Sequence, residues 1–448
     1  MAIRVSDPAT GSVLGSCPES DVEDVHKAID SAAAALPLWR AQTNRTRSRI
    51  LRRWHDLVHD NRADLAKLIT LENGKAKPDA IGEVAFANSF LEWYSEEAAR
   101  IYGDVIPHSA PGFRASVLKE PIGVCGIIVP WNFPAAMVTR KLGPALAAGC
   151  TVVIKSAGET PFTANALAIL GERAGIPKGV INIVTALENT PRVGAAFCTS
   201  SIIRKISFTG STRVGKLLMR QSSDTLKKMS LELGGNAPFI VFSDADISVA
   251  VNAAIGSKFK SSGQTCVCSN RIMVHSSVYD EFMRRFKEVV STFVLGHGDS
   301  DHTTHGPLIS AAAVARAHGL VEDSVRRGAK IEIGGQKRSD LGELALMMPQ
   351  GRKRLTSIST GPNFFEPTIL SNVTADMRVC KEEIFAPIAP VSIFQTEDAA
   401  LLMANDCDVG LAAYIFTQDI NRATRVTEQL QFGMVALNTG IISDAALP

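Results

Sequence analysis

The sequence predicts an α/β protein with two lobes, each built on a parallel sheet. From residue 150 onwards, short runs rich in β-branched residues alternate with helical stretches, which is typical of βαβ units. A second series of the same kind begins at 271–275, so we expect two sheets joined by a hinge near 234–236. A chain of 448 residues is long enough for two large domains.

The individual elements are predicted in chain order from the spacing of apolar residues. Apolar positions three and four residues apart predict amphipathic helices over 21–36 and 46–73. β-branched runs predict strands at 151–155, 180–184, 203–208, 229–233, 238–242 and 271–275. Helices are predicted at 161–175, 211–221, 246–259 and 278–293. Residues 337–362 have weak periodicity and a Gly-Arg-Lys-Arg cluster, and we expect a solvated surface loop there rather than a nucleic-acid patch.

The composition is that of an ordinary globular protein, with 46% hydrophobic and 21% charged residues. The 47 Lys and Arg against 45 Asp and Glu leave a net charge of +2, so neither nucleic acid nor a membrane is an expected partner. Eight cysteines without a C-x-x-C pair or a zinc ligand set favour a reducing compartment, and the N-terminus has no targeting signal. We therefore expect a cytoplasmic protein.

Two features of the sequence suggest a membrane span and a metal site, and we reject both interpretations. The uncharged run from Pro121 to Thr139 is long enough for a membrane span, but polar and proline residues in its centre exclude one. His55 and His59 have a metal-binding spacing, yet no Glu follows His55 and no third ligand is evident. We expect these histidines, like His302 and His305 in a polar loop, to be solvated, and no metal site.

A possible anion site occurs where the strand ending near 208 meets the next helix. In the segment 207–215, Gly210 permits a tight turn, and Ser211 or Thr212 can cap the helix and donate to phosphate oxygens. The unpaired N–H groups of a first helical turn favour an anion. The segment is not the usual G-x-G-x-x-G fingerprint, and an ordinary capped helix remains an alternative.

Thiol chemistry is the reaction type that the sequence favours. Cys266 and Cys268 lie in a loop introduced by Gly263, and a loop or helix start is where a reactive thiol is found. The alternative is two small hydrophobic residues in a core. Glu232 lies between Leu231 and Leu233 at the end of a predicted strand, so it points away from two apolar neighbours toward a possible cleft.

Five motifs together resemble the aldehyde dehydrogenase superfamily along nearly the whole chain. They are Pro130–Pro134, Phe208–Ser211, Leu231–Gly235, Gly263–Cys266 and Glu382–Pro387. Within the superfamily, the chain is most similar to succinate-semialdehyde dehydrogenases. That closer similarity lies in Thr139–Lys141, the Cys-Val-Cys pair and Asn438–Ser443.

The resemblance implies an aldehyde dehydrogenase fold, with two Rossmann-type α/β lobes and a partial β oligomerisation extension. It implies an NAD(P)-binding domain over 1–103 and 122–234, a catalytic domain over 235–431, and oligomerisation segments at 104–121 and 432–448. Members of the family are expected to extend beyond both ends of this sequence, including a C-terminal strand of the oligomerisation sheet. A homodimer or homotetramer is expected if that strand is dispensable, and an unpaired strand near 112–120 would be an aggregation hazard.

The resemblance also implies the catalytic roles. Cys266 would attack the aldehyde as a thiolate, while the Asn132 side-chain amide and the Cys266 N–H bind the oxyanion. Hydride transfer would leave a thioester, which Glu232 hydrolyses by activating water. The presence of Glu232 argues against the CoA-acylating branch. Closure of a Cys266–Cys268 disulfide would switch the activity off.

The expected cofactor is NADP or NAD, with NADP favoured. Lys155 would bind the adenosine ribose, Ser211 the pyrophosphate and Glu383 the nicotinamide ribose, with Lys141 also near the cofactor. The full predicted cofactor set is Trp131, Lys155, Gly158, Gly210, Ser211, Glu383 and Phe385. NAD-preferring members have a Glu where this chain has Gly158, and loss of that carboxylate removes repulsion against a 2′-phosphate. Glu159, one residue along, can counteract this.

The predicted substrate is an aldehyde with a carboxylate tail, succinate semialdehyde first. Arg140 and Ser443 match the family's tail-binding positions, and Lys260 replaces a second Arg, keeping the charge without the bidentate fork. Two alternatives stay open. One is a dehydrogenase for a different aldehyde, and the other is a catalytically silent family member that only binds nucleotide.

Overall fold

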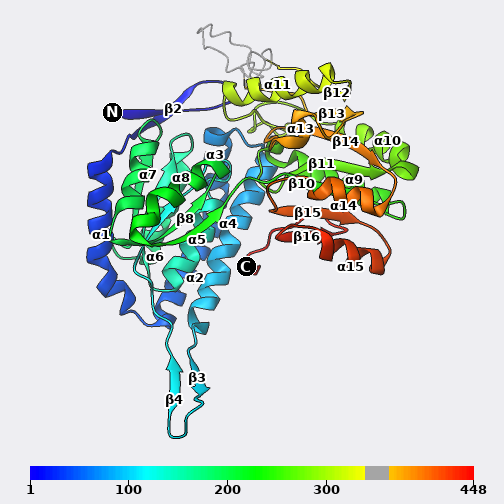
Figure 1. Ribbon diagram of the computed structural model, residues 1–448. Coiled ribbons are helices and arrows are strands. Elements are labelled where there is room, and N and C mark those ends of the chain that lie inside the picture. Colours follow the sequence, from blue (N-terminus) through cyan, green and yellow to red (C-terminus); the bar gives the residue numbers. More distant parts are fainter. Residues whose placement is uncertain (339–362, 448) are drawn as a thin grey trace.

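The computed structural model describes residues 1–338 and 363–447. Two α/β lobes stand side by side, and a two-stranded hairpin projects away from both (Figure 1). The first lobe contains a five-stranded sheet and the second a seven-stranded sheet. The predicted loop at 337–362 lies outside the described residues, apart from its first two. No helix of the described residues is long and apolar enough to cross a membrane.

The five-stranded sheet is parallel throughout, in the order β7-β6-β5-β8-β9. Its strands are β5 (Val124–Ile128), β6 (Thr151–Ala157), β7 (Ile181–Ala186), β8 (Ile203–Thr209) and β9 (Lys228–Glu232). Every residue of β5 and β6 is buried, as expected for central strands covered on both faces. This arrangement brings the carboxyl ends of β5, β8 and β9 to one edge, where loops from neighbouring strands can form a site.

Helices cover both faces of this sheet. One face packs against α1 (Val22–Arg40), α7 (Thr190–Thr199) and α8 (Thr212–Ser222). The other face packs against α2 (Asn44–Asp60), α3 (Arg62–Asn73), α4 (Lys77–Glu97), α5 (Ala136–Ala147) and α6 (Pro161–Ala174). The single helix predicted over 46–73 is wrong, because Asn61 leaves the helical conformation and its side chain donates to the Leu57 carbonyl at 2.7 Å.

The seven-stranded sheet has the order β12-β13-β14-β11-β10-β15-β16, and only the β12–β13 pair is antiparallel. Its strands are β10 (Ala237–Val241), β11 (Ser269–His275), β12 (Lys330–Ile333), β13 (Thr368–Ser371), β14 (Ile388–Phe394), β15 (Ala412–Phe416) and β16 (Met434–Leu437). β16 falls in the range predicted as an oligomerisation segment, and it pairs with β15 in this sheet.

The helices of the second lobe also form two layers. One face of the sheet packs against α9 (Ile247–Phe259) and α10 (Tyr279–Val290). The other face packs against α11 (Ala311–Arg326), α13 (Arg378–Lys381), α14 (Glu397–Asn405) and α15 (Ile420–Gln429). Short 3₁₀ turns occur at Ala98–Arg100, Ser223–Thr225, Lys260–Gly263 and Ser276–Val278. The connection 233–236 joins β9 of the first sheet directly to β10 of the second, at the position predicted as a hinge.

Two hairpins lie outside the sheets. β1 (Ala2–Ser6) and β2 (Val13–Pro18) pair beside the first lobe. β3 (Asp104–Pro107) and β4 (Arg114–Val117) form the projecting hairpin, and all four residues of β3 are exposed (Figure 1). Large apolar side chains here face solvent, among them Val105, Phe113 and Leu118 at 72, 67 and 81% exposure. Such a concentration of exposed apolar groups marks an interaction surface.

Candidate active site

The loop that follows β5 carries Asn132. Its side chain is only 5% exposed, and its Nδ2 donates to the main-chain carbonyl of Gln264 at 2.9 Å. Its Oδ1 is buried and has no hydrogen-bond partner within the described residues. Because Gln264 lies two residues before Cys266, this hydrogen bond joins the two loops that were predicted to share the reaction.

The loop that carries Cys266 has an unusual backbone. Ser261 and Ser262 adopt left-handed conformations with φ of 52° and 54°, and Gly263 follows at 74°. A Cβ at Gly263 would lie 2.3 Å from the Ala386 carbonyl oxygen, so only glycine fits. The Gln264 side chain accepts a hydrogen bond from the Ile309 N–H at 3.0 Å. These contacts hold the chain immediately before the thiol.

The two thiols of the pair have different surroundings. Cys266 is partly exposed, whereas Cys268 is 1% exposed and its Sγ donates to the Lys258 carbonyl at 3.1 Å. Burial raises the pKa of the Cys266 thiol to about 11; the Glu383 carboxylate adds to this rise and the Arg140 guanidinium opposes it. Burial also raises the pKa of the Cys268 thiol. Cys266 is therefore the thiol that a substrate can reach.

Glu232 is the last residue of β9, and its side chain is exposed while Leu231 and Leu233 pack against the core, as the alternation predicts. The pKa of Lys141, on α5, is shifted by its surroundings. Burial and the Arg140 charge lower the pKa of Lys141 to about 8, while the Glu232 carboxylate opposes this shift. The Lys141 amine donates a hydrogen bond to the Ser207 hydroxyl on β8 at 3.1 Å.

Several predicted cofactor residues lie at the edge of the first sheet. Ser211 caps α8 by accepting a hydrogen bond from the Val214 N–H, and its side chain is exposed. Lys155 lies within the fully buried strand β6, and burial lowers the pKa of its amine. A Cβ on Gly210 would lie 2.4 Å from the Phe208 ring. A capped helix start, a nearby lysine and a glycine turn match the donors that a dinucleotide requires.

The remaining cofactor residues come from the second lobe and the loop after β5. One oxygen of Glu383 accepts a hydrogen bond from the Gly235 N–H at 3.2 Å, and burial raises the pKa of this carboxyl. The Trp131 and Phe385 rings meet edge to face with centroids 5.7 Å apart. Both lobes therefore contribute to one set of groups, which fits a cofactor lying between them.

Gly158 is constrained by packing as well as by its predicted role. A Cβ on Gly158 would lie 2.5 Å from the Leu187 Cβ and 3.0 Å from its Cα. The Leu187 main chain is itself fixed, because its N–H donates to Glu19 at 3.0 Å. A side chain at position 158, a Glu included, requires that this segment move.

The predicted tail-binding residues come from three elements. Arg140 lies on α5 with its guanidinium carbon 5.5 Å from the Phe90 ring centroid. Lys260 follows α9 and is exposed. Ser443 is partly buried in the segment after β16, and Gly440 packs so closely on α9 that a Cβ would lie 2.6 Å from the Ala253 carbonyl oxygen.

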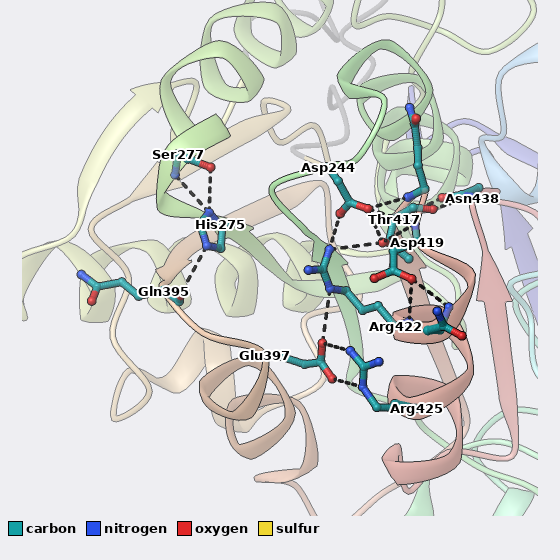
Figure 2. Close-up of polar contacts among 12 residues, drawn as sticks. Asp244, His275, Ser277, Gln395, Glu397, Thr417, Asp419, Arg422, Arg425 and Asn438 are labelled. Carbon is teal, nitrogen blue, oxygen red and sulfur yellow. Dashed lines mark hydrogen bonds and ion pairs between the residues drawn. The ribbon is translucent and has the colours of Figure 1, made fainter.

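A polar network fixes the start of that C-terminal segment (Figure 2). Asn438 exchanges two hydrogen bonds with the Thr417 main chain, at 3.1 and 2.9 Å. Thr417 donates to Asp244 at 2.8 Å, and Asp244 forms an ion pair with Arg422. The segment that carries Ser443 is thus anchored to the second lobe at its first residue.

Some sequence predictions about other polar residues need correction. His305 is not solvated; it is buried against the Phe259 and Phe293 rings, and burial lowers its pKa to about 4. Within residues 1–338 and 363–447, no group of His, Cys, Asp and Glu could hold a metal ion. Local sequence patterns do not indicate the buried pair of Lys75 and Glu83 behind Asn132, because charged residues near a helix start usually face water.

Comparisons with known proteins show what the chain is similar to. The model of the aldehyde dehydrogenase family matches residues 1–448. A succinate-semialdehyde dehydrogenase [NADP(+)] of Schizosaccharomyces pombe is 51% identical over 99% of this chain and 85% of its own length. A glutarate-semialdehyde dehydrogenase of Pseudomonas aeruginosa is 48% identical over 100% of this chain and 88% of its own length.

A solved structure extends the similarity to the fold. The crystal structure of a succinate-semialdehyde dehydrogenase from Burkholderia pseudomallei superimposes with a TM-score of 0.93 at 47% sequence identity. The superposition covers 100% of this chain and 88% of that chain.

Proposed function

Because the chain belongs to the aldehyde dehydrogenase family, we propose that it oxidises a semialdehyde with a carboxylate tail, using NADP. Family membership confirms the predicted fold class and the predicted enzyme class, an oxidoreductase that converts an aldehyde to an acid. Succinate semialdehyde is the first candidate substrate, and glutarate semialdehyde, one methylene longer, is the second. Each substrate appears in the name of a relative, and the two relatives have nearly equal sequence identity to this chain.

One observation carries the catalytic part of the proposal: the Asn132 amide is hydrogen-bonded to the loop of Cys266. The Cys266 sulfur, as thiolate, adds to the aldehyde carbon, and the carbonyl oxygen becomes an oxyanion. The second N–H of the Asn132 amide and the Cys266 main-chain N–H stabilise that oxygen. A bound NADP would supply the acceptor for the hydride of this carbon.

Glu232 acts as the general base in hydrolysis of the resulting thioester. Its exposed carboxylate takes a proton from a water molecule, which attacks the thioester carbon and releases the acid and the Cys266 thiolate. Lys155, Ser211 and Glu383 would hold the cofactor, with Trp131, Gly210 and Phe385 shaping its site. Arg140, Lys260 and Ser443 would hold the substrate carboxylate.

The cofactor preference rests on Gly158. Without a carboxylate at this position, a 2′-phosphate meets no repulsion there, and the packing of Leu187 keeps larger side chains out. We expect NADP to be used with a higher kcat/KM than NAD. A ratio well below one would contradict this part of the proposal.

The projecting hairpin supports an oligomer. Its exposed apolar side chains are suited to bury against a second copy of the chain, and we expect a homodimer or a homotetramer. Analytical ultracentrifugation tests this expectation, with Val105→Lys in the middle of β3 as the disrupting variant. A monomeric wild type at micromolar concentration would contradict it.

The direct test of function measures NADPH formation at 340 nm under reducing conditions with succinate semialdehyde, glutarate semialdehyde and propanal. We expect turnover of the two semialdehydes to exceed that of propanal, and Cys266→Ser to be inactive. A preference for propanal would favour a different aldehyde as substrate. Cofactor binding, seen as a raised Tm, with no turnover of any aldehyde would indicate a silent nucleotide-binding protein.

A further inference from the structure

A buried ion pair lies directly behind the loop that carries Asn132. It joins Lys75, in the turn between α3 and α4, to Glu83, inside α4, and neither side chain is exposed to solvent at all. Such a pair is stable only where further hydrogen bonds satisfy both charged groups. In this protein those bonds are made to the main chain of the segment 132–136.

The lysine holds the peptide of Asn132. Its Nζ donates to the Asn132 main-chain carbonyl at 2.9 Å and also lies 3.8 Å from the centroid of the Phe133 ring. Neighbouring Asn73 donates to the Trp131 carbonyl at 3.0 Å. Two consecutive carbonyls of the loop are therefore held by side chains from the end of α3 and the turn that follows it.

The glutamate holds the other end of the loop. Its second oxygen accepts hydrogen bonds from the main-chain N–H groups of Ala135, at 2.9 Å, and Ala136, at 3.4 Å. These N–H groups belong to the first turn of α5, where a carboxylate is also favoured by the helix dipole. The ion pair thus fixes the chain at Asn132 itself and again at the start of α5, three residues further on.

The Asn132 side chain depends on this support. Its Oδ1 has no partner within the described residues, so the amide is oriented only by the Nδ2 bond to Gln264 and by the position of its own main chain. A donor to an oxyanion must be held within about 0.5 Å of its working position. Movement of the Asn132 main chain would carry the amide away from the thiol loop.

We propose that Lys75 and Glu83 are positioning residues for the oxyanion site and act on the reaction through Asn132. The proposal rests on the proposed function, which assigns the Asn132 amide to the oxyanion. Within residues 1–338 and 363–447, the pair's hydrogen bonds go to the segment 132–136 and not to the thiol or the predicted cofactor groups. Its loss should therefore lower kcat while leaving NADP binding and the alkylation rate of Cys266 unchanged.

A double-mutant cycle on kcat tests the proposal, with the paired change Lys75→Met and Glu83→Gln on one side and Asn132→Ala on the other. The paired change leaves no uncompensated buried charge, so it avoids the main cause of misfolding. We expect Asn132→Ala to lower kcat about 10²–10³-fold, as for the loss of an oxyanion donor, and the paired change about tenfold or more. Combining them should lower kcat no further than Asn132→Ala alone.

A matched control is Glu72→Gln. Glu72 is a buried carboxylate on the adjacent α3, but it accepts from the Phe162 and Thr163 N–H groups of α6 rather than from the Asn132 loop. The Glu72→Gln variant should have a kcat within about threefold of wild type. A paired variant with wild-type kcat, or multiplicative losses in the cycle, would overturn the proposal. A wild type without any aldehyde turnover would instead contradict the proposed function.

Discussion

The proposed site contains two sets of polar groups. One set is buried and hydrogen-bonded, and the other is exposed to solvent. The anchored set, Asn132 with Gln264, Lys75 and Glu83, is buried and joined by hydrogen bonds across three segments of the chain. The exposed set, Glu232 and Lys260, lies at the ends of β9 and α9 with side chains in solvent. The groups proposed to bind developing charge are thus fixed in advance, whereas the two proposed to meet water and the substrate tail are accessible.

The largest expected effect on the steady-state rate is for Glu232→Gln, a change in the exposed set. This variant should stop after one turnover. Glu232→Gln should lower the steady-state rate about 10²–10⁴-fold, because general base catalysis of thioester hydrolysis is lost. The first turnover should still appear as a burst of NADPH equal to the enzyme concentration. Stopped-flow absorbance at 340 nm measures both phases.

The control for this variant is Glu172→Gln, an exposed carboxylate on α6 away from the site, which should be indistinguishable from wild type. If Glu232→Gln lost the burst together with the steady-state rate, Glu232 would act before hydride transfer, and its assignment to hydrolysis would be wrong.

The second effect concerns recognition of the substrate tail. Lys260→Met should lower kcat/KM for succinate semialdehyde about tenfold, equivalent to about 1.4 kcal/mol, and leave propanal unchanged. Lys260→Arg should raise selectivity for the semialdehyde, since the guanidinium can bind a carboxylate with two hydrogen bonds. Equal losses for both aldehydes in Lys260→Met would show that this lysine does not contact the tail.

The third effect is the pH dependence of thiol reactivity in the protein without cofactor. The pKa of Cys266 is raised to about 11, so its thiolate fraction is small at neutral pH and rises with pH. Alkylation of Cys266 by iodoacetamide should accelerate about tenfold per pH unit below that pKa. Arg140→Gln should slow alkylation at each pH, because it removes the positive charge that lowers the pKa of Cys266. A plateau beginning near pH 8 would contradict the account.

The smallest effect is expected at the second thiol. Cys268→Ser keeps a small side chain and a donor for the Lys258 carbonyl, and under reducing conditions its kcat should stay within about twofold of wild type. After treatment with hydrogen peroxide, wild type should recover activity with dithiothreitol more completely than Cys268→Ser, if the predicted Cys266–Cys268 disulfide forms. Equal recovery would remove Cys268 from any redox role.

The six predicted strands each overlap a strand of the structure, β6 to β11, because buried parallel strands are runs of apolar and β-branched residues; β5 and β12 to β16 were not predicted. The alternation around Glu232 likewise places its side chain opposite Leu231 and Leu233, as the structure shows. The break at Asn61 was missed because apolar residues continue through it at helical spacing. Such a break depends on one side-chain hydrogen bond to the preceding turn.

The anchored set was harder to predict for a physical reason. Lys75 and Glu83 are buried only because the loop after β5, some fifty residues further along the chain, supplies partners for both charges. Local sequence patterns report exposure of a helix face and not such long-range hydrogen bonds. His305 was predicted to be solvated because the polar residues of its own loop give no sign of its contacts with Phe259 and Phe293.

The central claim is that Cys266 forms a thioester that Glu232 hydrolyses. The most direct measurement is mass spectrometry of Glu232→Gln after acid quenching of a reaction with succinate semialdehyde and NADP. We predict a succinyl adduct on the peptide that contains Cys266, bound through Cys266 and not Cys268. Recovery of the unmodified peptide after a full NADPH burst, or an adduct on Cys268, would contradict the account.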